Sequence, residues 1–268
     1  MSNKKTEISI IYERGLDRRN RRVYFGVLGD DNEASFSWNS VSLAIRNLHV
    51  LVNDSSTKPI ELHMHSPGGE AYAMLHLIDE ILSCPCQIKF FGGGQISSAA
   101  TWVMAVCDER NLLPNTTIML HDGSEYIEGK HTDVQIEAFS SKNLQDKLNK
   151  LLADNSYMPE NFWSDILQRD LYVTAEEAVE LGIADNVIQY KKRGNLRKSR
   201  IAKMSVNKNP SKIKRLIKDL YKRTNRKTIN KIDISLPKKE EYDPNIIVDN
   251  NDISFDVFFD KEDKDNNN

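Results

Sequence analysis

The sequence predicts an α/β protein with a mainly parallel sheet, covering helices and a charged C-terminal extension. Apolar segments with strand spacing and with helix spacing alternate from Arg22 to Tyr190, and short turns rich in Gly, Asn and Pro separate them. The alternation ends after Tyr190. Because β-α-β crossovers return the chain to the same end of a sheet, this order favours parallel strands with helices on their faces.

The elements of the alternating region follow from spacing and from helix caps. The strands are predicted at residues 23–29, 59–66, 87–92 and 116–121, and the helices at residues 37–53, 71–83, 132–154 and 159–168. The first helix opens at a Ser cap, and the second carries Leu75, Ile78 and Leu82 on one stripe. A further helix is predicted after Thr174, because Glu177 occupies the capping-box position.

Charge divides the chain more sharply than its formal net charge of -2 suggests. The net charge is about -11 over residues 1–190, about +16 over residues 191–231 and about -8 over residues 240–268. We therefore expect three parts of different character. They are an N-terminal segment (residues 1–21), an α/β domain (residues 22–190) and a C-terminal extension (residues 191–268).

The extension is predicted to be largely disordered, because its first part is basic without a sustained period and its last part is acidic. Within it, a short amphipathic helix is predicted at residues 211–224, where Ile213, Leu216 and Ile217 begin an apolar stripe. This basic helix has two possible roles: docking on the acidic domain, or binding nucleic acid, an acidic partner or an anionic membrane. The apolar cluster at residues 255–259 is a candidate docking patch.

Composition also bears on the compartment. No run of about eighteen apolar residues is present, and the lysines near the N-terminus precede no apolar run, so we expect neither a membrane span nor an export signal. The three cysteines, Cys84, Cys86 and Cys107, are too few for a disulfide framework and form a poor zinc pattern. We therefore expect a cytoplasmic protein with reduced cysteines and with no metal or cofactor.

Two glycine-bearing turns, each between a strand and a helix, are candidates for chemistry. In HSPGGEAYAM, the residues Pro67-Gly68-Gly69 permit a tight turn whose N–H groups are free to stabilise an oxyanion. In FGGGQISSAATWVMAV, a helix is predicted to start near Ser98. A hydroxyl at a helix N-terminus lies in a positive partial field, which favours negative charge on an attacking oxygen. Ser98 is therefore a candidate nucleophile.

A serine nucleophile needs a base, and His121 is the best placed of the six histidines. It ends the predicted strand TTIMLH, at a strand tip where open α/β sheets build their sites. A base of this kind is normally oriented by a carboxylate, and Asp170 is a candidate, although the residues alone favour an ordinary surface role for it. The other histidines lack a carboxylate or cysteine at ligand spacing and are expected to be structural or surface residues. They are His49, His63, His65, His76 and His131.

Four segments, taken in order, resemble the ClpP family, which comprises the proteolytic subunits of the Clp protease. They are HSPGGEAYAM, GGQISSAA, LLPNTTIMLH and RDLYVTAEEAVELGIAD. The resemblance covers residues 22–190 and implies the ClpP/crotonase-type fold. It also implies that a protruding handle helix lies within residues 124–154.

The resemblance further implies a site and an assembly. Ser98, His121 and Asp170 would form the triad of a serine endopeptidase, and the N–H groups of Gly69 and Ala99 would form its oxyanion hole. The subunits would build a homo-oligomeric double ring. An AAA+ unfoldase would feed unfolded protein chains into the ring, and ATP would be used only by that partner.

The sequence departs from the family pattern at several places. Ala-Ala follows Ser98 where Met-Gly is usual, and Asp-Gly follows His121 where Gln-Pro is common. We expect these changes to alter the substrate groove more than the triad. Gln168 stands where many members have an acidic residue that senses ring assembly, which puts that switch in doubt. Ser97 adjoins Ser98, but the motif alignment favours Ser98 as the nucleophile.

Three other functions stay open at this point. A crotonase-type acyl-CoA enzyme would share the oxyanion hole but would not need the Ser-His-Asp set. A ClpP-like protease of viral capsid maturation would use the same chemistry, and the basic segment at residues 191–231 would tether it to a scaffold or to nucleic acid. An inactive assembly subunit beside active paralogues is the third alternative, and the intact triad argues against it.

Overall fold

The structure, a computed structural model, describes residues 7–27, 34–123, 127–189, 202–203 and 210–224. The helices are α1 (Glu7–Arg14), α3 (Trp38–Asp54), α4 (Ala71–Leu82), α5 (Ala99–Ala105), α6 (His131–Asp154), α7 (Glu160–Ile166), α8 (Ala175–Leu181) and α9 (Pro210–Arg223). The strands are β1 (Leu16–Asp17), β2 (Arg22–Phe25), β3 (Ser35–Phe36), β4 (Ile60–Ser66), β5 (Gly68–Gly69), β6 (Ile88–Ser97), β7 (Glu109–Leu112), β8 (Thr117–Leu120), β9 (Leu171–Thr174), β10 (Asn186–Gln189) and β11 (Ala202–Lys203).

The described strands form one nine-stranded sheet and a separate two-stranded sheet, β3-β5. The main path is β1-β2-β4-β6-β7-β10-β11, and every pair from β2 to β10 is parallel. The path branches at β6, because its last residues, 95–97, pair with β8 instead of β7. Strand β9 then pairs antiparallel with β8. The predicted α/β fold with a mainly parallel sheet is thus confirmed.

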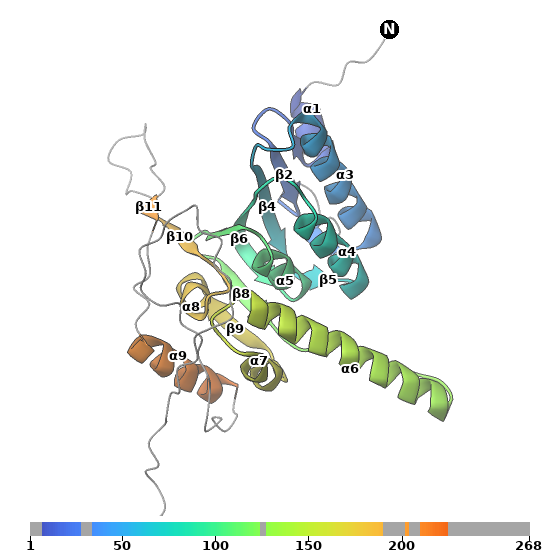
Figure 1. Cartoon of the computed structure of the whole chain (residues 1–268), viewed down its shortest axis with the longest axis vertical. Coiled ribbons are helices and arrows are strands. Elements are labelled where there is room, and N and C mark those ends of the chain that lie inside the picture. The colour runs from blue at the N-terminus through green and yellow to red at the C-terminus, as the bar shows by residue number, and fades with distance from the viewer. Residues whose placement is uncertain (1–6, 28–33, 124–126, 190–201, 204–209, 225–268) are drawn as a thin grey trace, which may run out of the picture.

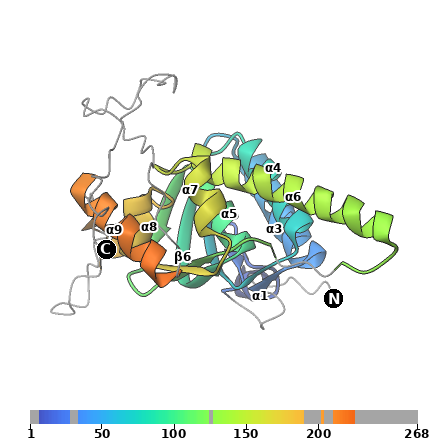
Figure 2. The same cartoon turned by 90° about the horizontal axis from the view of Figure 1, so that it is seen from below.

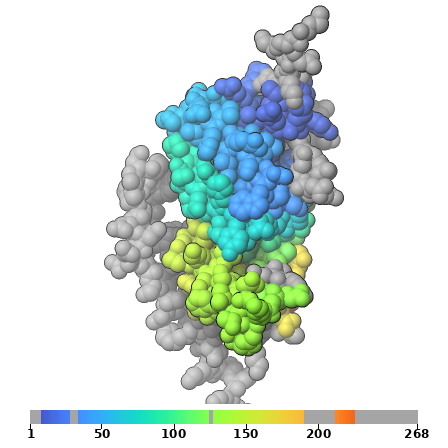
Figure 3. Space-filling view, turned by 90° about the vertical axis from the view of Figure 1, so that its right-hand side faces the viewer, coloured from blue at the N-terminus to red at the C-terminus, as the bar shows by residue number. Residues whose placement is uncertain are grey.

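The helices cover the sheet and extend beyond it. Helices α3 and α4 lie side by side next to β2 and β4 (Figure 1), and their blue and cyan surfaces adjoin in Figure 3. Helix α6 projects away from the body, which confirms the predicted handle helix (Figures 1 and 2). Its outer part exposes Ile136 and Phe139, whereas Leu148 and Leu152 are buried near its C-terminal end. Among the described helices, none has both the length and the apolar content needed to cross a membrane.

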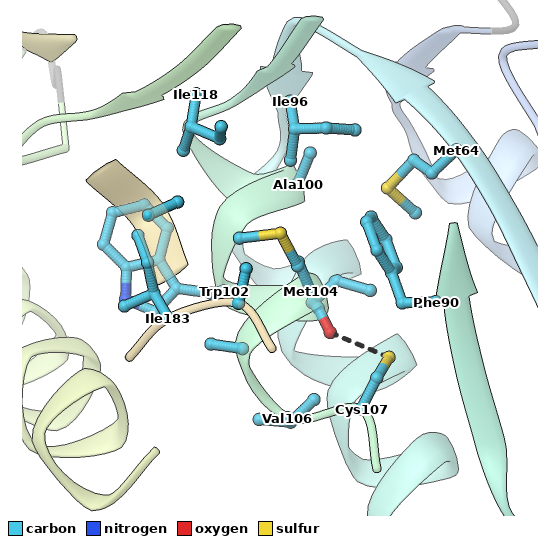
Figure 4. Close-up of a cluster of buried hydrophobic side chains, with 14 of the residues drawn as sticks. Met64, Phe90, Ile96, Ala100, Trp102, Met104, Val106, Cys107, Ile118 and Ile183 are labelled. Carbon is cyan, nitrogen blue, oxygen red and sulfur yellow. Dashed lines mark hydrogen bonds between the residues drawn. The ribbon is translucent and has the colours of Figure 1, made fainter. Parts of the chain in front are cut away.

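Helix α5 follows β6 directly and is buried along its whole length. Figure 4 shows its side chains packed among apolar residues of the sheet, including Phe90, Ile96 and Ile118. Side chains in a closely packed core have little room to move. The packing of α5 therefore fixes the position of its first residues, which follow Ser98.

The N-terminal segment contributes more to the fold than we predicted. It forms α1 and β1, and β1 pairs antiparallel with β2, so the sheet begins before residue 22. Leu16 of β1 lies in the core. The predicted strand at 23–29 is shorter in the structure and ends at Phe25, and residues 28–33 lie outside the described part of the chain.

The helix predicted in the extension forms one residue earlier, as α9, and packs on the domain. Its apolar side is buried, and Arg223 forms an ion pair with Glu177 of α8 at 2.8 Å. Of the two roles we considered for this helix, docking on the acidic domain is the one the structure contains. The acidic segment at residues 240–268, with its apolar cluster, lies outside the described residues.

Candidate active site

Ser98 joins β6 to α5 in a backbone conformation that is rare for a residue with a side chain. Its φ is 52° and its ψ is -126°. Such a conformation costs on the order of 1–3 kcal/mol and persists only where the surroundings enforce it. Here the Ser98 N–H donates to the Met119 carbonyl at 2.7 Å, and the buried Thr101 hydroxyl lies 3.1 Å from the same oxygen. These contacts fix the turn that presents the Ser98 hydroxyl.

His121 follows the end of β8, and β8 pairs in parallel with the last residues of β6. The carboxyl ends of these two neighbouring strands bring the histidine and Ser98 together. His121 Nε2 lies 2.8 Å from Ser98 Oγ, which is hydrogen-bonding distance. The His121 side chain is only 20% exposed. The pair therefore has the geometry in which an imidazole accepts a proton from a hydroxyl.

Asp170 lies on the other side of the imidazole. It immediately precedes β9, whose first residue, Leu171, pairs with Leu120 next to the histidine. The closest carboxylate oxygen, Oδ1, is 3.7 Å from His121 Nδ1, which is an ion-pair distance but too long for a hydrogen bond. The Asp170 side chain is 60% exposed, whereas an orienting carboxylate of this kind is normally buried. The structure thus brings all three side chains into a row, with a loose contact at the carboxylate.

The glycine turn lies against the serine. Gly68 has a φ of +100°, and a Cβ atom at this position would lie 2.6 Å from the Ser98 Cβ and 3.1 Å from the Ala99 nitrogen. Gly69 has a φ of +147° and approaches the backbone of Phe36 equally closely. Only glycine accommodates such positions. The backbone N–H groups of Gly69 and Ala99 therefore come from two segments that are in direct contact beside Ser98.

Strand β3 and Ser66 support this turn from behind. Ser35 and Phe36 pair in parallel with the two glycines, and the Glu70 N–H donates to the Phe36 carbonyl at 2.9 Å. The Ser66 hydroxyl, which is fully buried, donates to the Ala34 carbonyl and accepts from the Gly68 N–H at 3.1 Å. The position of the turn thus depends on a segment that is remote in sequence.

Helix α6 contacts both halves of the site. The Trp102 indole N–H in α5 donates to the Leu148 carbonyl at 3.1 Å. The Gly123 N–H, two residues after the histidine, donates to Gln145 at 3.2 Å, and the Gln145 amide donates to the buried Asn149 at 3.0 Å. The base of the handle helix is therefore connected to the serine side and to the histidine side.

The remaining candidates lie apart from the row of three. Ser97 is fully buried, and its hydroxyl makes no hydrogen bond within the described part of the chain. Gln168 is exposed, and its amide donates to a carbonyl one turn earlier in the chain, at Ser164. The described residues contain no group of three or more His, Cys, Asp or Glu side chains arranged to hold a metal ion.

The other histidines take structural or surface positions. His63 bonds Glu61 and stacks on Phe91, and His65 accepts from the Gln95 N–H at 3.1 Å. The remaining three are on helices: His49 and His76 lie beside Glu80, and His131 begins α6.

Several supporting residues escaped sequence reasoning, namely Ala34, Phe36, Ser66, Thr101 and Gln145. Each makes at least one hydrogen bond with a residue far away in sequence. The spacing of residues carries no signal for contacts of this kind.

A parallel sheet with covering helices, a protruding helix and a serine–histidine pair at adjacent strand ends is a fold of the ClpP type. A sequence model of the Clp protease family matches residues 32–191, which is more than half of the chain. The chain therefore belongs to the Clp protease family, a family of peptidases. The matched residues end before α9.

Proposed function

We propose that the protein is a serine endopeptidase and the proteolytic subunit of an ATP-dependent protease. The observation that carries this proposal is the 2.8 Å contact between His121 Nε2 and Ser98 Oγ. A serine hydroxyl is a weak nucleophile unless a base accepts its proton during attack. Membership of a peptidase family supports the choice of a peptide bond as the substrate.

The reaction proceeds through an acyl-enzyme. Ser98 Oγ attacks the peptide carbonyl carbon while His121 takes the hydroxyl proton, and the N–H groups of Gly69 and Ala99 donate to the resulting oxyanion. Collapse of the intermediate breaks the C–N bond, and the leaving amine takes the proton from the histidine. Water then attacks the ester with the same base, which releases the carboxylic acid and restores the serine. Every step uses protein groups and water, so we propose no cofactor.

Asp170 orients the base in this scheme. Its carboxylate faces the second ring nitrogen of His121 and favours the tautomer that leaves Nε2 free to accept. The same charge stabilises the imidazolium that forms during attack. Because the contact measures 3.7 Å, its contribution depends on how closely the Asp170 segment is held.

The working form we propose is a homo-oligomeric double ring in the cytoplasm, served by an AAA+ unfoldase that spends ATP and delivers unfolded chains. The exposed Ile136 and Phe139 on α6 support a contact between rings, because apolar side chains on a projecting helix are suited to burial in an assembly. Three free cysteines support a reducing compartment.

A second candidate function is the maturation of viral capsids by the same chemistry on a dedicated partner. The outward face of α9 favours it, since Lys212, Arg215 and Lys218 are exposed there and would suit an acidic scaffold or nucleic acid. Crotonase-type chemistry and an inactive assembly subunit are less well supported, because neither gives the Ser98–His121 contact a role.

Covalent labelling of the full chain tests the proposal. A fluorophosphonate probe is expected to label the native oligomer at Ser98, and Ser98→Ala is expected to lose both labelling and peptide hydrolysis. Ser97→Ala is the matched control and should keep both, because its hydroxyl makes no contact that the reaction needs. Hydrolysis that survives in Ser98→Ala would overturn the proposal. The two candidate roles differ in their substrates. Degradation of unfolded protein together with an unfoldase would support the ATP-dependent protease, whereas cleavage of one assembly partner only would support capsid maturation.

A further inference from the structure

Helix α9 is part of the core although it lies outside the family match. Ile213, Ile217, Leu220 and Tyr221 are each no more than 2% exposed, and they join the same apolar cluster as the sheet and the other helices. Burial of this extent makes α9 an integral element of the domain.

Helix α9 contacts the two helices that flank Asp170 in sequence. Its Tyr221 ring packs edge-on against Phe162 of α7, with ring centroids 6.2 Å apart. Its Arg223 makes a bidentate pair with Glu177 of α8, at 2.8 and 3.3 Å. Figures 1 and 2 both show α9 beside α8, and α7 ends four residues before Asp170.

The contact with α8 reaches the Asp170 segment through the helix cap. Glu177 also accepts from the Thr174 N–H at 2.9 Å, and Thr174 is the last residue of β9, the strand that starts directly after Asp170. Bidentate pairing with a guanidinium restricts a carboxylate more than a single bond does. Arg223 therefore holds Glu177, and Glu177 holds the C-terminal end of β9, the strand that follows Asp170.

Asp170 is the member of the row that most needs such support. Its side chain is 60% exposed and its oxygen lies 3.7 Å from the imidazole, so a shift of well under 1 Å decides whether a hydrogen bond forms. We infer that α9 is a positioning element for Asp170, with Arg223 as the positioning residue. This inference rests on the proposed function.

A double-mutant cycle on the full chain tests it. Arg223→Gln removes the bidentate pair and is expected to lower kcat about three- to fivefold with KM unchanged, in line with a partly exposed ion pair. Arg223→Lys keeps the charge and should recover part of the loss. The control is Lys222→Gln, an exposed neighbour outside these contacts, which should leave kcat unchanged.

The decisive measurement repeats Arg223→Gln in an Asp170→Asn background. If α9 acts through Asp170, Arg223→Gln has no further effect there, because coupled residues are not additive. An equal loss of kcat in both backgrounds, or no loss in the wild-type background, would overturn the inference while leaving the peptidase intact. A wild-type chain that neither labels at Ser98 nor hydrolyses peptides would instead overturn the proposed function, and this inference with it.

Discussion

The backbone of Gly68 lies so close to Ser98 that a methyl group on the glycine would stand 2.6 Å from the serine Cβ. Ser98 itself holds a positive φ of 52°, so neither residue has room to adjust. Two turns are thus in close contact and cannot move independently. One carries Gly69, the proposed oxyanion donor, and the other carries Ser98, the proposed nucleophile.

Gly68→Ala is therefore expected to disable the site. The methyl group must push the two turns apart, which would misplace the Gly69 N–H and lower kcat on the order of 10²-fold, as for loss of an oxyanion donor. Steady-state hydrolysis of a small peptide measures this. Gly123→Ala is the matched control, because a Cβ at Gly123 meets nothing within 4 Å. Equal activity of the two variants would contradict the close contact between the Gly68 turn and Ser98.

Ser66→Ala is expected to loosen the same turn without adding bulk. The change leaves the Ala34 carbonyl and the Gly68 N–H without their shared partner, and unsatisfied buried groups cost about 1–3 kcal/mol. We expect a lower unfolding midpoint in urea together with a lower kcat. Ser66→Cys, which keeps a weak donor, should be intermediate. A stability loss with unchanged kcat would show that Ser66 supports the fold alone.

Stability should depend on pH through His63. Burial lowers the pKa of His63 below 6.5, its ordinary value, and the nearby Arg22 charge adds to this, while the bond to Glu61 opposes it. The unfolded chain therefore binds more protons than the folded one, so this contribution to stability is complete above pH 6.5 and is lost as the pH falls toward the folded pKa.

Urea unfolding at pH 7.5 and at pH 5.5 measures the effect of His63. The wild-type chain should lose stability between these two values, and His63→Phe, which keeps the stacking on Phe91, should lose less. His76→Gln changes an exposed histidine and should behave as the wild type. The same pH dependence in all three proteins would exclude His63 as its source.

Assembly should depend on the outer part of α6. Replacing both Ile136 and Phe139 by Ser removes two side chains that are 63% and 67% exposed in the single chain. If they join the rings, native mass measurement should find half-size particles. Lys142→Ser, an exposed change on the same helix, should leave the full particle intact. Full-size particles in the double variant would show that Ile136 and Phe139 do not hold the two rings together.

The longer elements were predictable from sequence because their periodicity is strong. Strands β4 and β8 and helices α3, α4, α6 and α7 lie within a few residues of the predicted ranges, whereas β6 extends five residues beyond its predicted end, to Ser97. Strands β7, β9 and β10 were not predicted, since these short strands are stabilised by their neighbours in the sheet more than by their own residue pattern.

The site was predictable only in part. The strand-end position of His121 and the Gly68-Gly69 turn are local features, whereas the choice of Asp170 came from family resemblance. The predicted turn at Gly92-Gly93-Gly94 is wrong, because these residues lie within β6. The exposure of Asp170 and its 3.7 Å separation from the histidine depend on the packing of α7, α8 and β9. No local pattern contains that information, and the same is true of the contacts that Ser66 makes.

The burial of Tyr221 also bears on how the protein is synthesised. This side chain is fully enclosed, so the core stays incomplete until the ribosome has added residue 221 of 268. Until then the partners of α9 on α7 and α8 are uncovered, and Phe162 lacks the ring of Tyr221. A nascent chain would therefore carry an open apolar surface late into translation, when such surface favours aggregation.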